Sequence, residues 1–368
     1  MGQRTMKAAV CHSQDQPISI DTVPVPAPVG REMLCRVKSA SLCHSDISII
    51  SGAFGGPGLF PQIIGHEAVA VVEELGPDAA KWGEGFQVGD LVGGPLWHNM
   101  CLECTDCRKA GPQFCPKMQV KGMNCPGYFS EYTCVDAASA VVISRGASSS
   151  SSSSPSQLPL SPRRLAPLFC AGITVWDALE QAHLRMGETV AVVGAGGLGQ
   201  LAVQYAAALG ARVIALDVRD EQLESVKGDN GAQSVINTSG LAPEALSQRV
   251  LDANNGELVD VAIVTSGVVP AYNTALAIVR SYGRVIAVGL PHSEIPISAQ
   301  LITARSLSLI GSHVPGQASS RKCLDFTLRK HIAPLVNERR FKLEDLNEMI
   351  DLMKAGKVEA GRMVVDFF

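Results

Sequence analysis

Short apolar runs alternate with longer amphipathic stretches through the second half of the chain. Residues 189–193 form a β-branched apolar run, which is typical of a buried parallel strand. Residues 198–209 repeat apolar positions at helical spacing and stop at a glycine, and residues 212–216 form a second apolar run. Four more runs follow, separated by helical stretches such as 270–281: SVIN, VDVAIVTSG, GRVIAVGL and LSLIGS. The pattern predicts an α/β fold with a doubly wound parallel sheet over about residues 171–312.

Glycines lie between the first apolar run and the first helix, in a spacing typical of dinucleotide binding. The stretch GAGGLG has the order G-x-G-x-x-G, and the second strand ends in an acid. Such glycines let the backbone approach a pyrophosphate at the positive end of a helix. The motif alone is weak, but strand, glycines, helix, strand and acid in this order are specific. The candidate cofactor-binding residues of this Rossmann-type unit are Gly194, Gly196, Gly197, Leu198, Gly199 and Asp217.

The acid at the strand end predicts which dinucleotide is used. Asp217 is placed to accept hydrogen bonds from the adenosine ribose hydroxyls, and its charge repels a 2′-phosphate. We therefore expect NAD as the cofactor, with NADP less favoured, although Arg219 two residues later could soften this preference. The alternative interpretation of Asp217 is a solvated acid at the end of a strand.

Length and composition describe an ordinary globular protein with two domains. The chain has 368 residues, of which 46% are apolar and 18% charged, and its net charge is −4. No basic run exceeds two residues, so no nucleic-acid partner is expected. No apolar stretch approaches the roughly 20 residues of a membrane span, and the N-terminus lacks a signal-peptide pattern. We expect a cytoplasmic protein that does not contact a membrane.

A cytoplasmic location changes how the eleven cysteines are interpreted, because thiols stay reduced there. Four of them fall within the stretch CLECTDCRKAGPQFC, which also contains a glycine and a proline: Cys101, Cys104, Cys107 and Cys115. Four thiolates so closely spaced are typical of a closed tetrahedral zinc site. Such a site has no vacant coordination position, so it stabilises structure and performs no chemistry. The alternative is a loop whose cysteines occur together by coincidence.

Three further motifs carry a cysteine or a histidine in the first half of the chain. SLCHSD contains Cys43, IIGHEAVAVVEELG contains His66, and APLFCAGITVWDAL contains Cys170 at an expected helix start. Taken singly, each is also a common buried cysteine or a hydrogen-bonded histidine. Together with the cysteine loop, GAGGLG, IGSHV and GRMVVD, they resemble the zinc-dependent alcohol dehydrogenases of the medium-chain dehydrogenase/reductase superfamily, in a yeast-type pattern. The resemblance covers nearly the whole chain.

The resemblance implies two domains and an assembly. A GroES-like β-rich catalytic domain is expected from both chain ends, and a Rossmann NAD-binding domain from the middle. The expected boundaries are 1–170 for the catalytic domain, with a structural zinc lobe at about 95–118 and a serine-rich insertion at about 146–164, then 171–312 for the Rossmann domain and 313–368 for the return. Relatives of this kind are homo-oligomers, and a tetramer is favoured over a dimer.

The resemblance also assigns roles to individual residues. The ligands of the catalytic zinc are expected to be Cys43, His66 and Cys170, the combination known for alcohol dehydrogenases. The other roles are Ser45 taking the alcohol proton, Asp46 orienting His66, Glu67 lying beside the metal, and His44 and Arg362 approaching the pyrophosphate. With the cysteine loop this gives two zinc ions per subunit. The expected reaction interconverts primary or secondary alcohols, including bulky ones, with aldehydes or ketones by hydride exchange with NAD.

The chain departs from the family pattern at three places. Ser48 stands where the proton relay of the family usually ends in a histidine. Phe54 stands where yeast-type enzymes carry a tryptophan in the substrate pocket, which with Ser45 suggests a roomier site. Residues 144–164 are longer than the usual connection and include seven consecutive serines, which predicts a mobile linker.

Two rival functions remain open on the sequence. A zinc-free quinone or enoyl reductase of the same superfamily would lack the set of two cysteines and one histidine, which is present here. A non-catalytic dinucleotide-binding scaffold or redox sensor would be favoured by the loss of a catalytic ligand. None is lost, and only Ser48 points in that direction.

Overall fold

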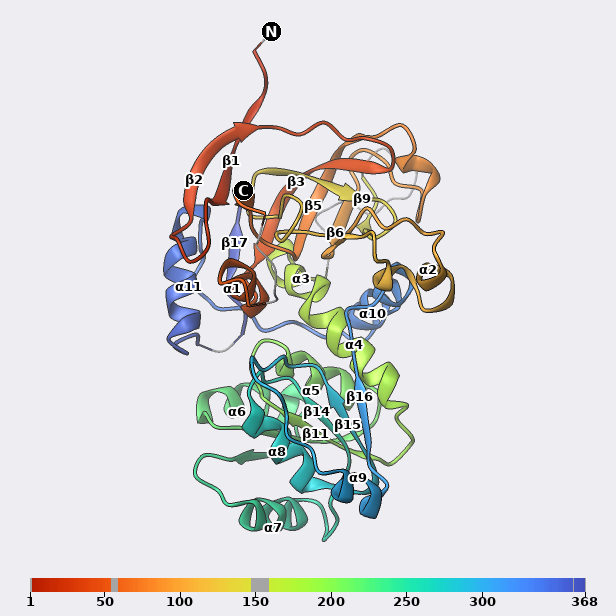
Figure 1. Cartoon of the computed structure of the whole chain (residues 1–368), viewed down its shortest axis with the longest axis vertical. Helices are drawn as coiled ribbons and strands as arrows, with labels where there is room; N and C mark the ends of the chain where they lie inside the picture. The colour runs from red at the N-terminus through yellow and green to blue at the C-terminus, as the bar shows by residue number, and fades with distance from the viewer. Residues whose placement is uncertain (1, 54–58, 147–158, 360, 368) are drawn as a thin grey trace. The chain divides into compact units, whose positions relative to one another are not determined.

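A computed structural model describes residues 2–53, 59–146, 159–359 and 361–367 (Figure 1). The chain separates into two compact units. Unit 1 contains Met1–Cys170, Pro315–Val358 and Arg362–Phe368, and unit 2 contains Ala171–Val314 and Glu359–Gly361. The chain passes from unit 1 to unit 2 directly after Cys170. It returns to unit 1 after Val314, which is two residues beyond the expected boundary at 312.

Unit 2 is built on a six-stranded sheet with the order β13-β12-β11-β14-β15-β16. All neighbouring strands in it are parallel. The strands are β11 (Thr189–Val193), β12 (Arg212–Asp217), β13 (Ser234–Asn237), β14 (Val259–Val264), β15 (Val279–Ala287) and β16 (Ser308–Gly311). The strand order reverses beside β11, as in a doubly wound Rossmann sheet. The predicted fold class is confirmed for this unit.

Helices cover both faces of this sheet, which is why its strands are continuous apolar runs. Helices α5 and α6 contact each other and β12, whereas α7 contacts α8, which contacts β14. Every residue of β11 is buried. The helices are α4 (Ala171–Ala182), α5 (Gly199–Ala208), α6 (Asp220–Val226), α7 (Pro243–Ala253), α8 (Val269–Ile278) and α9 (Ala299–Arg305), with a 3₁₀ turn η5 (Gly228–Asn230).

The predicted helix at 270–281 is wrong at its C-terminal end. Helix α8 ends at Ile278, and Val279 already belongs to β15, where it pairs with Val259. A register irregularity follows in this pair of strands, and Tyr282 within it has a φ of 61°. Apolar spacing cannot distinguish a helix end from a strand start here, because β-branched Val279 is favourable in the sheet.

Unit 1 is mostly antiparallel β structure. Its main sheet has the order β10-β6-β5-β3-β17, with β9 also paired to β3, and a three-stranded sheet has the order β2-β1-β4. The strands are β1 (Thr5–Cys11), β2 (Ser19–Pro24), β3 (Glu32–Ser41), β4 (Gln62–Ile63), β5 (Ala68–Leu75), β6 (Leu91–Gly94), β7 (Trp97–His98), β8 (Gln119–Val120), β9 (Tyr132–Asp136), β10 (Val141–Ser144) and β17 (Val364–Asp366). An apolar core that includes Met33, Val37 and Met363 lies between these elements.

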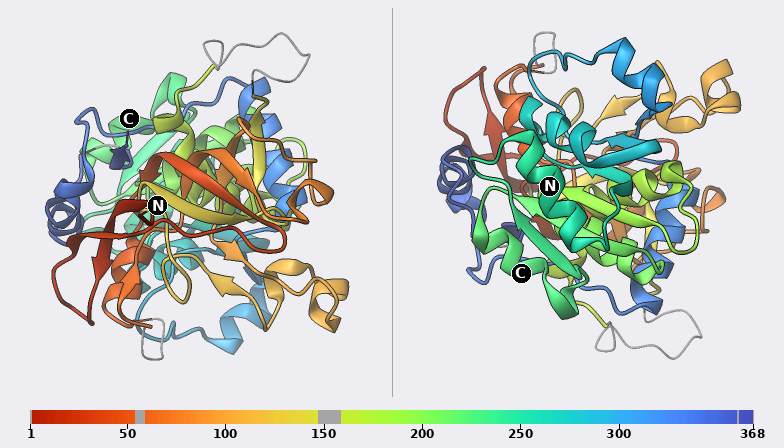
Figure 2. Two further views of the ribbon diagram at one scale, coloured as in Figure 1. Left: turned by 90° about the horizontal axis from the view of Figure 1, so that it is seen from above. Right: turned by 90° about the horizontal axis from the view of Figure 1, so that it is seen from below.

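The helices of unit 1 are short and come from three parts of the chain. They are α1 (His44–Ile50), α2 (Thr105–Lys109), α3 (Pro162–Leu165), α10 (Gln317–Arg329) and α11 (Leu346–Lys354), with 3₁₀ turns η1 (Ala79–Lys81), η2 (Pro112–Phe114), η4 (Ala166–Phe169) and η6 (Leu343–Asp345). Blue C-terminal elements therefore lie among red and yellow N-terminal ones in Figure 2. Strand β17 joins them directly, because Val364 pairs with Ser41 of β3.

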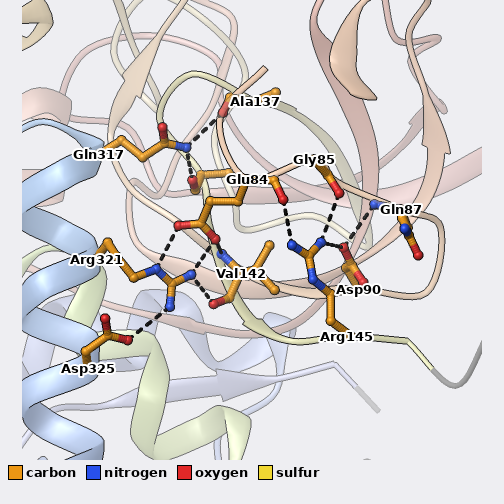
Figure 3. A network of polar contacts seen from close by, with 11 residues as sticks. Glu84, Gly85, Gln87, Asp90, Ala137, Val142, Arg145, Gln317, Arg321 and Asp325 are labelled. Carbon is orange, nitrogen blue, oxygen red and sulfur yellow. Dashed lines mark hydrogen bonds and ion pairs between the residues drawn. The ribbon is translucent and has the colours of Figure 1, made fainter. Parts of the chain in front are cut away.

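A polar network attaches the returning helix α10 to the N-terminal part of unit 1 (Figure 3). The Nε atom of Arg321 donates to Glu84 at 2.7 Å, its Nη2 donates to Glu84 and to the carbonyl of Val142, and its Nη1 donates to Asp325 at 3.3 Å. One turn earlier, Gln317 donates to the carbonyl of Ala137 at 3.0 Å. Arg145 belongs to the same network, where it donates to Asp90 at 2.7 Å. The network therefore fixes the position where the chain re-enters unit 1.

Replacing Arg321 by alanine should lower the free energy of unfolding by about 2 kcal/mol, because a partly buried Glu84 would lose its charged partner. Arg329→Ala, on the exposed end of the same helix, is the matched control and should change stability by less than about 0.5 kcal/mol. Chemical denaturation of the three proteins measures this. Equal stability of both variants would contradict the role of the network.

Two predicted features lie outside the described residues: Phe54 and the serine run 148–154. The expected end of the insertion at about 164 overlaps helix α3, whose Arg163 is buried and pairs with Asp366 at 3.3 Å. Among the helices that the structure describes, none is both long and apolar enough to span a bilayer.

Candidate functional site

Strand register brings the first two expected ligands together. Strands β3 and β5 are antiparallel, and Ala40 near the end of β3 pairs with Ala68 at the start of β5. Cys43 follows β3 and caps helix α1, while His66 precedes β5 by two residues. Because the end of one strand meets the start of the other, both side chains emerge at the same edge of the sheet.

The third expected ligand arrives from a separate segment. The turn η4 is buried throughout and contacts β3, β5 and β6. Cys170 follows it with φ −132° and ψ −70°, so the chain changes direction there before α4 begins at Ala171. The expected helix start at Cys170 is thus displaced by one residue.

The donor atoms of Cys43, His66 and Cys170 all lie within 4.8 Å of one another, and all three residues are buried. His66 Nε2 is 3.3 Å from Cys170 Sγ, and the two sulfur atoms are 4.0 Å apart. Tetrahedral zinc with bonds of about 2.0–2.3 Å places its ligand atoms roughly 3.5–3.8 Å apart. The spacing and the soft donor set therefore fit a zinc ion held by three protein ligands.

Asp46 orients two of these ligands at once. Its Oδ1 is 2.7 Å from His66 Nδ1, and its Oδ2 accepts from the backbone N–H of Cys43 at 2.9 Å. Burial would lower the pKa of His66, but the charge and the hydrogen bond of Asp46 outweigh it and raise that pKa well above its ordinary value. With Nδ1 held by Asp46, Nε2 faces the two thiols, as metal-binding histidines require.

The two thiols of this cluster lie within hydrogen-bond distance of each other. Their hydrogen bond lowers the pKa of Cys43 and raises that of Cys170, because one sulfur keeps the proton that the other accepts. The positive charge of Arg362 also favours the Cys43 thiolate. The low pKa of Cys43 favours its thiolate, which is the form that binds metal.

Glu67 and Arg362 form a buried ion pair beside the cluster. Arg362 Nη2 is 2.9 Å from Glu67 Oε1, and the two side chains are 5% and 0% exposed. Burial raises the pKa of Glu67 to about 8, although the charge of Arg362 opposes the shift. Arg362 also donates to the carbonyl of Leu42 at 3.4 Å. Its expected approach to the pyrophosphate stays a prediction.

Helix α1 contributes the remaining expected residues of this region. Ser45 Oγ lies 3.7 Å from Cys43 Sγ, so its hydroxyl borders the ligand cluster. His44, the first helical residue, is exposed, which suits contact with a cofactor. Ser48 comes one turn after His44 and is only 7% exposed.

The four cysteines of the loop also converge. Their sulfur atoms lie within 4.8 Å of one another, with Cys101 Sγ 3.9 Å from Cys107 Sγ and 3.5 Å from Cys115 Sγ. Cys104 caps helix α2 and accepts from the backbone N–H of Cys107. Backbone hydrogen bonds lower the pKa of Cys101 to about 6, whereas burial raises that of Cys107 to about 12. Four sulfurs at these spacings fit a closed tetrahedral zinc site.

In unit 2 the glycine turn has the geometry that pyrophosphate binding needs. A side chain at Gly199 would place its Cβ 1.8 Å from the carbonyl oxygen of Gly194, so only glycine fits. Gly194 has a φ of 101°, and nothing lies within 4 Å of the Cβ position of Gly196. Helix α5 begins at Gly199 without a side-chain cap, and the N–H groups of Gln200 and Leu201 donate to the carbonyls of Gly196 and Leu198. The open space at Gly196 is therefore where a pyrophosphate can approach the backbone.

Asp217 lies at the end of β12, where it is held by backbone groups. Its Oδ2 accepts from Ala195 N–H at 2.7 Å and its Oδ1 from Arg219 N–H at 3.0 Å. A cavity of about 310 Å³ opens beside it and is lined by Gly194, Asp217, Val218, Thr238, Ser266 and Val268, among others. The carboxylate is therefore fixed at the border of a space large enough for a nucleoside.

Comparison with known proteins identifies the family. Residues 30–145 match the family described as Alcohol dehydrogenase GroES-like domain, and residues 197–329 match the family described as Zinc-binding dehydrogenase. An alcohol dehydrogenase of Geobacillus stearothermophilus is 33% identical over 362 residues, which cover 98% of this chain and 99% of that protein. The chain belongs to the zinc-binding alcohol dehydrogenase family.

Two solved structures are similar to this chain along nearly its whole length. The alcohol dehydrogenase of the archaeon Aeropyrum pernix superposes with a TM-score of 0.84 at 27% identity, covering 98% of this chain and 100% of that one. The protein CAD of Helicobacter pylori, solved with NADP(H), has a TM-score of 0.81 at 24% identity with 99% of both chains covered, which shows the fold alone. The narrower yeast-type pattern stays a prediction for this chain.

Sequence reasoning missed two features of the site. It identified Glu67 and Arg362 but not their pairing, because they are far apart in the chain and no spacing signal links them. It also gave no role to Phe169, which directly precedes a ligand, or to Gly93, on which Phe169 lies. His98, near the cysteine loop, is buried and bonded to Glu32 at 2.9 Å.

Proposed function

We propose that this chain is a zinc-dependent alcohol dehydrogenase that exchanges hydride between an alcohol and NAD. The observation that carries the proposal is the buried set of Cys43, His66 and Cys170, in a chain that also has a dinucleotide-binding turn. Three ligands leave one of four tetrahedral positions for substrate. Zinc held there supplies Lewis acidity towards an alcohol or carbonyl oxygen, and a nicotinamide supplies the hydride acceptor.

The side chains around the site have complementary tasks. Asp46 fixes His66 and the backbone of Cys43, so the donor geometry is set before a metal arrives. The Ser45 hydroxyl beside Cys43 is the proposed first acceptor of the alcohol proton. Glu67, whose pKa burial raises to about 8, lies beside the cluster in contact with Arg362.

The cysteine loop is the proposed second zinc site. Its four sulfurs fill a tetrahedral shell, so the ion braces the loop between Cys101 and Cys115 and takes no part in turnover. We expect two zinc ions per subunit. Ligand cysteines bind as thiolates, which supports the reducing cytoplasm as the proposed location.

Asp217→Gly should narrow or reverse the preference for NAD over NADP. The wild-type carboxylate would repel a 2′-phosphate, so its loss should change the ratio of kcat/KM values at least about tenfold, or ~1.4 kcal/mol. Glu221→Gln, an exposed acid in the following helix, is the control and should leave the ratio unchanged. A wild-type protein that prefers NADP would contradict the assignment of Asp217.

Ser48→His should raise alcohol oxidation near neutral pH. A serine can conduct a proton but cannot store one near neutrality, so wild-type oxidation should be slow at pH 7 and rise towards alkaline pH. The variant should add a titration near ~6.5 and gain several-fold in rate, less than the roughly 10²–10⁴ of full general base catalysis. Aldehyde reduction should change less. A wild-type profile that is flat from neutral to alkaline pH and unaffected by Ser48→His would show another proton route.

The substrate is a primary or secondary alcohol, and the proposed range includes bulky ones. A panel of alcohols of graded size, assayed for NAD reduction together with the reverse reaction, tests the function. Turnover of at least one alcohol is expected. A folded protein that binds zinc and NAD but oxidises none would favour a non-catalytic scaffold or redox sensor, and turnover of quinones or enoyl compounds without zinc would favour the zinc-free reductase class.

The proposed assembly is a homo-oligomer, with a tetramer favoured over a dimer. This proposal rests on family membership alone. Light scattering measures the mass directly, and a stable monomer would contradict it.

A further inference from the structure

Cys170 lies at the boundary between the two units of the chain, and its side chain is buried. It is the last residue of unit 1, and Ala171 starts the first helix of unit 2. Its own backbone is not helical, with φ −132° and ψ −70°. One peptide bond thus separates a zinc ligand from an element of the other unit. The residues before Cys170 belong to the same unit as the other two ligands, so contacts of those residues can fix its position.

Phe169, the residue before Cys170, makes such a contact with strand β6. Its ring is fully buried and lies directly on Gly93 in strand β6. A Cβ atom at Gly93 would fall 1.8 Å from Cζ and 1.9 Å from Cε1 of the ring. An ordinary carbon–carbon contact is about 3.5–4.0 Å, so the ring occupies the volume that any side chain at this position would need. Gly93 is therefore a seat for the ring.

The position of Gly93 is fixed by pairing with strands on both sides. Gly93 pairs with Val69 of β5 on one side and with Val141 of β10 on the other. The adjacent pair in the β5–β6 register is Ala68 with Gly94, and Ala68 also pairs with Ala40 of β3. Gly93 consequently lies at the sheet edge from which Cys43 and His66 emerge. The contact of the Phe169 ring with Gly93 therefore links the position of Cys170 to the strands that carry the other two ligands.

We propose that Phe169 is a positioning residue for the third metal ligand, Cys170, and that Gly93 is needed because only glycine leaves space for the ring of Phe169. The inference rests on the proposed function, because it concerns zinc held by Cys43, His66 and Cys170. Ligand distances in a well-formed zinc site lie within about 0.2 Å of their usual values. A side chain at Gly93 would push the ring away by more than about 1 Å, and Cys170 is the next residue.

Gly93→Ala tests this directly through metal release. Zinc transfer to a colorimetric chelator should be at least about tenfold faster from the three-ligand site than in the wild type, in the range found when groups that orient ligands are altered. The four-cysteine site of the same molecule is an internal control and should release its zinc at the wild-type rate. In the cobalt-substituted protein, the thiolate-to-metal absorption should shift or weaken.

Gly94→Ala is the matched control in the same strand. A Cβ there would meet the hydroxyl oxygen of Tyr128 at 2.6 Å, so it brings a milder clash with a ring whose residue is not adjacent to a ligand in the chain. It should lower stability without accelerating release from the three-ligand site. Gly93→Ala combined with Phe169→Leu should restore slow release in part, because leucine lacks the ring atoms that overlap. If Gly93→Ala does not fold, Phe169→Ala removes the ring without a clash and should also accelerate release.

The outcomes separate this inference from the proposed function. Wild-type release and cobalt absorption in both Gly93→Ala and Phe169→Ala would overturn the positioning role while leaving the zinc site intact. Equal acceleration in Gly94→Ala would overturn it as well, since a general weakening of β6 would then suffice. A wild-type protein with no zinc at Cys43, His66 and Cys170 would instead remove the proposed function.

Discussion

Replacing Cys43 by serine is expected to reduce alcohol turnover at least about 10³-fold while the protein stays folded. The substitution removes one of three donors from a buried set, so the zinc at this site should be lost and with it several kcal/mol of charge stabilisation during catalysis. Steady-state NAD reduction with the best alcohol measures turnover, and elemental analysis should show one zinc ion fewer per chain.

Cys134→Ser is the matched control for this prediction. Cys134 lies on β9, outside both groups of clustered cysteines, and is partly exposed. It should retain turnover and zinc content. A Cys43→Ser protein that loses a zinc ion but oxidises alcohols at the wild-type rate would show that the three-ligand site is not the catalytic one.

Replacing Cys104 by serine is expected to lower the free energy of unfolding by about 3 kcal/mol or more. Structural zinc contributes its binding energy to folding, and this contribution reaches about 10–16 kcal/mol in small zinc-binding peptides. Cys104 both joins the sulfur cluster and caps helix α2, so its loss weakens the loop in two ways. Chemical denaturation with matched zinc content is the measurement.

The same variant separates the two zinc sites by function. Turnover per folded molecule should fall much less in Cys104→Ser than in Cys43→Ser, because the loop site has no vacant coordination position. Unchanged stability of Cys104→Ser, with the loop zinc gone, would contradict a bracing role. The Cys134→Ser protein serves again as the reference for a cysteine-to-serine change.

Local sequence signals predicted the second unit well, because its chemistry is local. The run at 189–193 is β11, and the glycines that follow it form the turn before α5. Backbone crowding explains why: the carbonyl of Gly194 lies 1.8 Å from the Cβ position of Gly199, so the spacing of the motif records a geometric requirement. Helix α8 ended earlier than predicted, because pairing of Val279 in the sheet is a long-range contact.

The three-ligand site could be predicted only through resemblance. Nothing in the spacing of Cys43, His66 and Cys170 requires them to meet, since the register of β3 with β5 and the burial of η4 bring them together. The same holds for Glu67 with Arg362 and for Phe169 on Gly93. By contrast, the four cysteines of the loop lie within fifteen residues, so their convergence is visible in the sequence.

Zinc content per chain tests the central claim most directly. Elemental analysis of the purified protein, on a sample with measured alcohol turnover, should give two zinc ions per chain, one for each of the two clusters. Two ions with turnover would support a catalytic and a structural site in this alcohol dehydrogenase. One ion or none in a sample that oxidises alcohols would contradict the account.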